Sequence, residues 1–407
     1  MTAIRILHIS DLHLAQHSQR HSVLDRVEPV RTAVEKLLLT DLKNAILSGS
    51  LEDVEGAFND FLEEESIAEV LTALQQVDPG RIPAALDDVL DRIARRDGSF
   101  QELLVQTLKD FTIASSYNTG SLDCLCNFVE EQEPDLHAII ITGDLATTGF
   151  DFDLEKGRIF LEGSGVFDQS IAATPAAKML LPGNHDRYIY TAKGFLFAPG
   201  GKRFEAILKN HWSGPVRTYP SLRNGNDLSV IIIAADFCLQ SKNDCTLPFL
   251  KLSRLAQGRV YPTILDELVS ATEDAKKDAR SKGYTPVILW AVHFPPFFVH
   301  RDSSRVSRAL NNLTKNLIDE KLLVEKAKEN NVYAILAGHT HEAQDYEERG
   351  LGVRILCAGS ATQDDATNKH CQIIEVSRNN FNQPKVIIRE FEQHDDYTSF
   401  RPKSSTI

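Results

Sequence analysis

The stretch Lys178–Asp186 reads KMLLPGNHD: a short apolar run stops at a proline and a glycine, and asparagine, histidine and aspartate follow at once. A second stretch, Tyr333–His341, repeats this plan as YAILAGHTH. An apolar run bounded by turn residues is typical of a buried strand, and glycine allows a tight turn after it. Both stretches therefore predict a strand whose end presents several metal-binding groups.

Three further segments end apolar runs in the same way, namely Asp11-Leu-His13, Gly143-Asp144 and His293. Ligands of open α/β sheets bind beyond the carboxyl ends of the strands, so we expect all five segments to meet at one rim. Carboxylate, imidazole and carboxamide groups together suit divalent ions such as Mn, Fe, Zn or Co. Two such ions, roughly 3.5–4 Å apart, can clamp a phosphoryl group and activate a water molecule. The sequence thus predicts a binuclear metal centre.

Helical and strand patterns alternate from Leu122 onward, and closely spaced strands follow near the end of the chain. This order predicts an α/β (α+β) fold with two packed mixed β-sheets flanked by helices. We expect strands at residues 4–10, 138–142, 178–181, 228–235, 287–292, 333–337, 354–358, 372–376 and 385–391. We expect helices at residues 122–131, 204–211, 264–282 and 317–330.

Residues 16–115 differ from the rest of the chain, because their apolar residues recur with helical spacing and almost no strand pattern is present. Capping-box patterns separate several amphipathic stretches there, and acidic residues outnumber basic ones. We therefore expect an all-α module inserted into a core formed by residues 1–15 and 116–393. A polar tail at residues 394–407 is expected to be loosely ordered.

The composition narrows the class of protein. The net charge of -13 disfavours a long nucleic-acid track or an anionic membrane surface as partner. The six cysteines lack paired CxxC spacing, which disfavours a zinc ribbon or a disulfide framework. No apolar segment approaches the roughly 20 residues of a membrane span, and the first residues have no signal-peptide layout. We expect a cytoplasmic protein with no membrane partner.

The five segments resemble the signature of the calcineurin-like metallophosphoesterase family, which is DxH, GD, GNH[D/E], H and GHxH. The resemblance covers the core and leaves out the helical insertion, and it implies the family's four-layer sandwich. It also implies a first metal bound by one set of residues, a second metal bound by another, and one aspartate that bridges them. These sets are Asp11, His13 and His341 for the first ion, Asn184, His293 and His339 for the second, and Asp144 for both.

The same resemblance gives the two remaining polar residues of the GNHD segment a catalytic role. His185 would not bind metal, but would contact the phosphate and help protonate the leaving group. Asp186 would be the partner that orients His185.

Within the family, the chain is similar to the branch of cyclic-nucleotide and small-molecule phosphodiesterases. Residues 143–149, GDLATTG, resemble the GDLT-x-x-G form of that branch and lack the GDxxDRG continuation of protein serine/threonine phosphatases. Residues 293–296, HFPP, resemble its HHPP motif, and Phe294 is expected to alter the pocket wall more than the metals. Residues 358–362, AGSAT, resemble the strand end that follows GHxH in this branch.

The resemblance implies an enzyme, a metal-dependent phosphoesterase that hydrolyses a phosphodiester or monoester of a small organic or nucleotide substrate through a binuclear centre and a bridging hydroxide. One alternative is a DNA or RNA exonuclease subunit of the same superfamily, which carries the same five motifs. Another is a non-enzymatic scaffold, disfavoured because every ligand position is filled. The insertion at residues 16–115 is expected either to cap the cleft or to dock a protein partner or gate the substrate.

Overall fold

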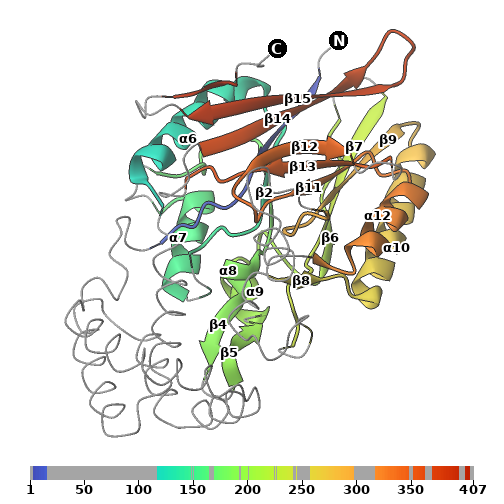
Figure 1. Cartoon of the computed structure of the whole chain (residues 1–407). Helices are drawn as coiled ribbons and strands as arrows, with labels where there is room; N and C mark the ends of the chain where they lie inside the picture. Colours follow the sequence, from blue (N-terminus) through green and yellow to red (C-terminus); the bar gives the residue numbers. More distant parts are fainter. Residues whose placement is uncertain are drawn as a thin grey trace, which may run out of the picture.

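The computed structural model (Figure 1) describes the chain in separate stretches, and nothing below concerns the residues outside them. The inserted module expected at residues 16–115 lies outside the described residues. The described residues are 3–15, 117–147, 149, 151–164, 169–191, 194–199, 201–223, 225, 227–241, 244, 257–297, 317–347, 352–362, 369–393 and 399–403.

The first of two large sheets has six strands in the order β16-β15-β14-β1-β2-β3. Its strands β1, β2 and β3 run parallel, and β14, β15 and β16 continue it with antiparallel pairing. The parallel strands place their carboxyl ends at one edge. The bounds are β1 Ile4–Ile9, β2 Ala138–Thr142, β3 Ala177–Leu181, β14 Lys369–Arg378, β15 Pro384–Gln393 and β16 Phe400–Pro402.

The second sheet also has six strands, in the order β12-β13-β11-β9-β7-β6. Strands β7, β9, β11 and β13 are parallel, and the two edge strands pair antiparallel to them. The bounds are β6 Val216–Thr218, β7 Leu228–Ala235, β9 Thr285–Ala291, β11 Ala334–Ala337, β12 Ala343–Glu347 and β13 Arg354–Ala358. Both sheets are therefore mixed, as the sequence predicts.

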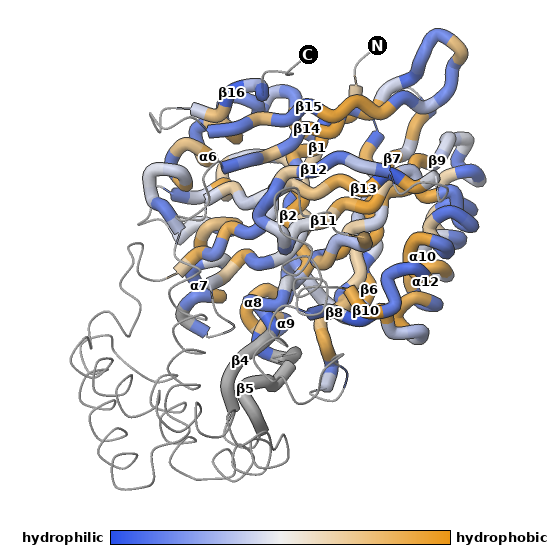
Figure 2. The backbone as a smooth tube through the Cα atoms, viewed as in Figure 1, coloured by the Kyte–Doolittle hydropathy of each residue, from blue (hydrophilic) through white to orange (hydrophobic). Residues whose placement is uncertain are grey.

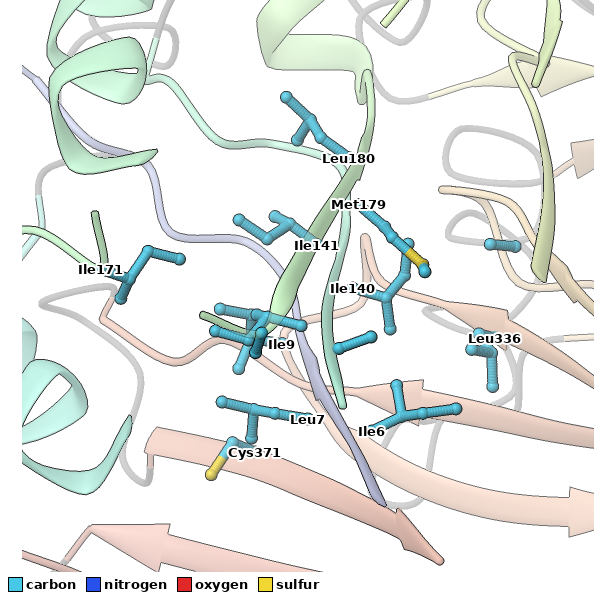
Figure 3. Close-up of a cluster of buried hydrophobic side chains, with 14 of the residues drawn as sticks. Ile6, Leu7, Ile9, Ile140, Ile141, Ile171, Met179, Leu180, Leu336 and Cys371 are labelled. Carbon is cyan, nitrogen blue, oxygen red and sulfur yellow. The ribbon is translucent and has the colours of Figure 1, made fainter. Parts of the chain in front are cut away.

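The two sheets pack face to face and helices cover their outer faces, which confirms the expected α/β sandwich. Side chains alternate across each strand, so Ile6, Ile140 and Met179 of the first sheet lie on the side of Leu336 from the second (Figure 3). The opposite face of the first sheet packs against α6 (Thr119–Gln132) and α7 (Asp151–Glu162). The outer face of the second packs against α10 (Pro262–Ser281) and α12 (Glu320–Glu329). Hydrophobic residues accordingly line central strands such as β11 and β13, and hydrophilic residues cover the outer turns of α10 (Figure 2).

Smaller elements complete the described part of the chain. A two-stranded hairpin of β4 and β5 follows the short helix α8, and a two-stranded parallel pair joins β8 and β10. Their bounds are η2 Glu133–Asp135, α8 Asn184–Arg187, β4 Tyr188–Thr191, β5 Gly194–Pro199, α9 Gly201–Ile207, β8 Gly258–Arg259 and β10 Leu317–Ile318.

The helix expected at residues 317–330 is wrong at its start. Leu317 and Ile318 pair with Gly258 and Arg259 as strand β10 instead. Asp319 has a φ of 62°, a left-handed conformation that separates the strand from a helix beginning at Glu320.

The described part of the tail, residues 399–403, differs from the expectation of loose order. Strand β16 at Phe400–Pro402 adds to the edge of β15, because Phe400 is buried and contacts Phe128 of α6 with ring centroids 5.6 Å apart. The sequence patterns also gave no sign of helix α7 or of strand β12. Within the described residues, no helix is both long and apolar enough to cross a membrane.

His8 on β1 is a fully buried imidazole that the sequence patterns did not single out. Its ring nitrogens lie 3.2 Å from Gln372 Oε1 and 3.1 Å from Thr142 Oγ1. Burial lowers the pKa of His8 from 6.5 to about 4, and the hydrogen bond with Gln372 opposes this only in part. The folded protein therefore keeps this imidazole neutral at a pH where the unfolded chain would protonate it.

We predict that this difference makes the fold less stable as the pH falls from about 6.5 to 4. The unfolded state binds a proton in that window and the folded state does not, so His8 would cost about 2–3 kcal/mol of stability by pH 4.5. Urea unfolding at pH 7 and pH 4.5 measures this loss, and His8→Gln should lose less stability than wild type between the two values. A His137→Gln control at a half-buried position should keep the wild-type slope. Equal slopes in wild type and His8→Gln would contradict the prediction.

Candidate metal centre

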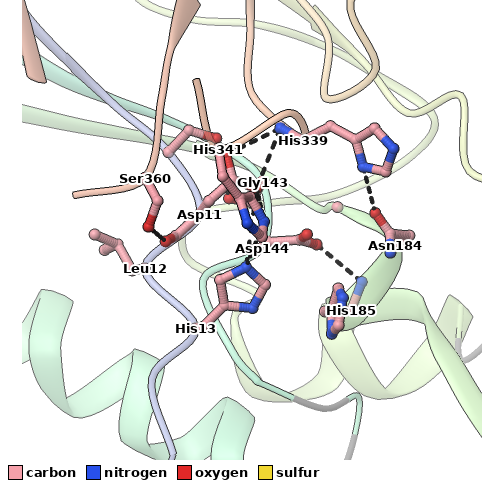
Figure 4. A network of polar contacts seen from close by, with 12 residues as sticks. Asp11, Leu12, His13, Gly143, Asp144, Asn184, His185, His339, His341 and Ser360 are labelled. Carbon is pink, nitrogen blue, oxygen red and sulfur yellow. Dashed lines mark hydrogen bonds and ion pairs between the residues drawn. The ribbon is translucent and has the colours of Figure 1, made fainter. Parts of the chain in front are cut away.

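The five predicted segments meet at one rim between the two sheets. Figure 4 shows residues of four of them, and His293 joins these through its contacts with Asn184 and Asp144. The first sheet supplies three of them, from the carboxyl ends of β1, β2 and β3, and the second supplies two, from the ends of β9 and β11. Every residue predicted as a metal ligand lies there. The parallel strands of both sheets explain the convergence, because parallel strands end at the same edge.

The first group of candidate ligands is Asp11, His13, Asp144 and His341, whose ligand atoms all lie within 4.8 Å of one another. His13 Nε2 and His341 Nε2 are 3.1 Å apart, and Asp11 Oδ1 is 3.4 Å from His341 Nε2. Two ligand atoms of one ion have about these separations from each other when each lies roughly 2.0–2.1 Å from the ion. In the described residues, His13 Nδ1 is buried and has no hydrogen-bond partner. The donor types and spacing of this group fit a divalent metal ion.

The second group consists of Asp144, His293 and His339, and Asp144 is the member that both groups share. Asn184 completes it, because its Oδ1 lies 2.9 Å from His293 Nε2 and 3.0 Å from His339 Nδ1. His293 Nε2 is also 3.2 Å from Asp144 Oδ2. Four donors thus surround a second point that a divalent ion fits, beside the first.

The electrostatics of the site favour a charged carboxylate at Asp144. Burial alone would raise its pKa, but the His293 and His185 imidazoles bring the pKa well below its usual range. In the other direction, burial opposes protonation of His293, yet the adjacent Asp144 raises the pKa of His293 to about 9. For His13, burial followed by the nearby imidazoles of His185 and His341 holds the pKa well below 6.5. The rim thus combines an anionic carboxylate with several imidazoles packed around it.

Five of the candidate ligands have left-handed backbone conformations. The φ angles are 52° at Asp11, 49° at His13, 51° at Asp144, 68° at His339 and 57° at His341. Residues other than glycine rarely adopt such angles, and each instance costs of order 1–3 kcal/mol. The chain therefore turns sharply at each of these residues, and the surrounding structure has to hold the turns in place.

Two motif glycines allow the close approach of these turns. Gly143 has a φ of 97°, and a Cβ placed there would collide with the His293 ring and lie 2.9 Å from Gly183 Cα. A Cβ on Gly183 would collide with the carboxylate of Asp144 and lie 2.5 Å from its backbone nitrogen. The glycines of GD and GNHD are needed because their segments touch each other.

Side-chain hydroxyls hold the strained Asp11–His13 segment, a role that the sequence motifs do not predict. Ser360 Oγ donates to the Asp11 carbonyl at 2.7 Å, Thr362 donates to the Leu12 carbonyl, and Thr147 donates to the His13 carbonyl. The backbone amides of the same segment donate to the residues after β2. In the sequence, the resemblance of residues 358–362 and 143–149 to family motifs was the signal that could have indicated these contacts. The hydroxyls of both segments donate to carbonyls of the Asp11–His13 segment.

His185 lies beside the first group, with its ring centroid 4.7 Å from that of His13. Its backbone nitrogen donates to Asp144 Oδ1 at 2.8 Å, and its Nδ1 donates to the Thr147 carbonyl at 2.8 Å (Figure 4). The ring is thus oriented with Nε2 as the remaining polar atom.

The expectation that Asp186 orients His185 does not match its hydrogen bonds. The Asp186 carboxylate is buried and accepts from the backbone amides of Gly183, Leu145 and Ala146, at 2.9, 3.2 and 2.8 Å. The carboxylate turns inward because these amides need an acceptor that no strand supplies. Asp186 therefore joins the GNHD turn to the GD turn. The group that orients the His185 ring is the Thr147 carbonyl instead.

Phe294 also differs from its predicted place in the pocket wall. The side chain is fully buried, with ring centroids 4.9 Å from His293 and 4.7 Å from His339. It packs behind both imidazoles of the second group rather than facing an open pocket.

Two mixed sheets with paired metal-ligand groups at one rim define a metallophosphoesterase. Residues 112–343 match the family model of the calcineurin-like phosphoesterases, which is more than half of the 407 residues. The chain belongs to the calcineurin-like phosphoesterase family, a family of phosphoric ester hydrolases. The matched range leaves out Asp11 and His13, which β1 brings to the same rim.

Several solved structures are similar to this chain at low sequence identity. A dimetal phosphatase from Danio rerio is 10% identical over 70% of this chain and 90% of its own, with a TM-score of 0.42. The GAP50 anchor of the inner membrane complex of Plasmodium is 14% identical over 70% and 84%, with a TM-score of 0.39. The phosphopantetheinyl hydrolase of Mycobacterium tuberculosis is 15% identical over 57% and 83%, with a TM-score of 0.30. None of the curated proteins matches the sequence.

We predict that Gly143→Ala weakens metal binding as well as stability. The added Cβ forces His293 away from Asn184 and Asp144, and the positive φ adds strain of about 1–3 kcal/mol. Calorimetric titration with Mn²⁺ and urea unfolding of the metal-free protein measure the two effects separately.

Gly283→Ala provides the matched control for this experiment. Gly283 has a φ of 79° and no atom within 4 Å of a Cβ placed there, so it shares the strain but not the collision. It should lose stability and keep the wild-type affinity for Mn²⁺. If Gly143→Ala also kept that affinity, the fit of the GD and GNHD turns would not be what forms the second group.

Proposed function

We propose that this protein hydrolyses a phosphodiester, or a monoester, of a small organic or nucleotide substrate with the help of two divalent metal ions. The observation that carries the proposal is the pair of ligand groups sharing Asp144, with the His185 ring beside them. Two donor sets built around one carboxylate match what a binuclear centre for phosphoryl chemistry requires. The metals belong to the Mn, Fe, Zn or Co class, because the donors mix imidazole with oxygen ligands.

Asp11, His13 and His341 would hold the first ion, Asn184, His293 and His339 the second, and Asp144 both. When bound, the ions would neutralise the phosphate charge and lower the pKa of a coordinated water molecule. The chain's own contribution is to fix the donors in space before the substrate arrives. The left-handed turns and the hydroxyl contacts described above support such a preorganised site.

His185 is the proposed general acid. Its Nδ1 is engaged by the Thr147 carbonyl, which leaves Nε2 as the atom that can deliver a proton. A proton from Nε2 to the departing oxygen would neutralise the charge that develops when the P–O bond breaks.

Two features of the sequence support a small substrate and a role in solution. The GDLATTG segment resembles small-molecule phosphodiesterases rather than protein phosphatases, and the net charge of -13 disfavours a nucleic-acid track. We propose a cytoplasmic enzyme without a membrane partner. We further propose that the insertion at residues 16–115, which leaves the core close to His13 in sequence, docks a protein partner or gates the substrate.

We predict that Asp144→Asn and His185→Ala remove the hydrolysis of bis-nitrophenyl phosphate while the protein stays folded. Asp144→Asn takes the shared negative charge from both ligand groups. His185→Ala takes the general acid and should cost about 10²–10⁴-fold in kcat. Initial rates with Mn²⁺ measure the loss, and circular dichroism checks the fold.

His211→Ala is the control, because this histidine pairs with Glu162 at 3.2 Å, away from the rim, and should keep wild-type rates. Wild-type activity in both site variants would contradict the assignment. The same proteins assayed on labelled DNA test the exonuclease alternative, and degradation of DNA without hydrolysis of small esters would replace the proposal with it.

We predict that chelation removes both activity and part of the stability. A chelator should abolish hydrolysis, and added Mn²⁺ should restore it. At a metal concentration about 100-fold above the dissociation constant, binding should add about 2.7 kcal/mol to the free energy of unfolding. Thermal unfolding with and without Mn²⁺ measures this shift. A chelated protein with full activity and an unchanged unfolding midpoint would argue against a metal-dependent enzyme.

A further inference from the structure

Arg187, the last residue of α8, carries a buried guanidinium between two carboxylates. Its side chain is only 5% exposed, and its Nε donates to Asp236 Oδ2 at 2.8 Å. Its Nη1 donates to Glu205 Oε2 at 2.7 Å, and its Nη2 donates to the other oxygen of Glu205. The guanidinium also lies over the Phe204 ring, 5.2 Å from the centroid. These contacts engage both edges of the guanidinium, a geometry that lysine cannot reproduce.

The two carboxylates belong to different parts of the fold. Asp236 directly follows β7 of the second sheet, and its Oδ1 accepts the Cys238 backbone amide at 2.9 Å, which fixes the carboxylate. Glu205 lies on α9, whose Phe204 packs into the core that residues of both sheets form. Arg187 itself follows β3 of the first sheet by way of Asn184 and His185. The Arg187–Asp236 contact therefore ties a turn of the first sheet to the end of a strand in the second.

This link lies where the candidate centre needs it. Asn184 comes from the first sheet, but its Oδ1 must stay about one hydrogen-bond length from His293 and His339 of the second, at 2.9 and 3.0 Å. The helix that carries Asn184 has only four residues. Asp186 joins this helix to the GD turn of the first sheet, whereas Arg187 joins it to the second. The short helix is thus held from both sides.

Stability alone is a weak reason to bury these charges. Burying a guanidinium against carboxylates that are only 12% and 28% exposed is costly, and well-packed apolar residues often stabilise a fold as well or better. A role in setting register is the best-attested use of a buried ion pair. The position of this cluster, across the two sheets and beside two site residues, fits that use.

We propose that Arg187, acting through Asp236, is a positioning residue that sets the spacing between Asn184 and the two histidines of the second sheet. The inference rests on the proposed function only in taking this rim as the metal centre. Arg187 contacts neither ion nor substrate in this scheme. Its effect reaches the centre through the turn that carries Asn184 and His185.

The experiment compares Asp236→Asn with Glu205→Gln, because each removes one carboxylate from Arg187 and only Asp236 directly follows a strand of the second sheet. Three quantities are measured: Mn²⁺ affinity by calorimetry, the urea unfolding of the metal-free protein, and kcat and KM for bis-nitrophenyl phosphate. We expect Asp236→Asn to lower Mn²⁺ affinity at one of two sites about 10-fold and kcat by a similar factor, as for partners behind metal ligands. Glu205→Gln should lose stability and keep Mn²⁺ affinity within about twofold.

Arg187→Lys tests whether the guanidinium is needed to contact both carboxylates at once, and Arg158→Lys is its matched control. Arg158 also bridges two glutamates, Glu155 and Glu162, but it lies on α7 and away from the rim. Arg187→Lys should weaken Mn²⁺ binding at one site, and Arg158→Lys should leave both sites unchanged. Asp236→Asn with two wild-type Mn²⁺ affinities would overturn the proposal, as would equal losses in Asp236→Asn and Glu205→Gln. A wild-type protein that binds two Mn²⁺ but hydrolyses no phosphate ester would refute the proposed function and leave this test intact.

Discussion

The charge on Asp144 is the constraint around which the rim is arranged. Its carboxylate belongs to both candidate ligand groups, accepts the His185 amide, and lies 3.2 Å from His293 Nε2. A buried carboxylate needs partners to remain charged, and here the imidazoles of His293 from the second sheet and His185 from the first supply them. The contact between this carboxylate and His293 therefore joins the two sheets at the point where the chemistry is proposed to occur.

The positive φ angles follow from the same constraint. Strands that end side by side leave little room for seven converging side chains, so the chain turns sharply within a few residues of the ends of β1, β2 and β11. The left-handed turns accomplish this, and each has a cost. Offsetting contacts are found nearby: the hydroxyls of Ser360 and Thr362 donate hydrogen bonds to carbonyls of the Asp11–His13 segment, and the glycines of GD and GNHD let two turns touch. Strain at a functional site is thus balanced by hydrogen bonds outside it.

The sequence predicted the sandwich and the convergence of the ligands because both depend on local signals. Apolar runs that stop at Gly-Asn-His or Gly-His-Thr-His report a strand and its end together. The partners of individual side chains depend on tertiary contacts that no local pattern contains. Asp186 was expected beside His185, yet it faces three backbone amides. Phe294 was expected in the pocket wall, yet it lies behind two imidazoles. The β10 strand was missed because its partner is about 60 residues away in sequence.

Arg187 is a further residue whose role depends on a tertiary contact and not on a local sequence pattern. In the sequence it is one basic residue after GNHD, with nothing to distinguish it from a surface arginine. Only the folded structure gives a reason for its burial. Asp236, some 49 residues later in the chain, lies at the end of a strand in the other sheet and pairs with Arg187. The geometry of a centre built from two sheets depends on the distance between the sheets. A directional ion pair fixes that distance more sharply than the packing of apolar side chains does. The ion pair between Arg187 and Asp236, beside the turn that carries Asn184, supplies that direction, and this is a reason to place a buried charge there rather than another apolar side chain.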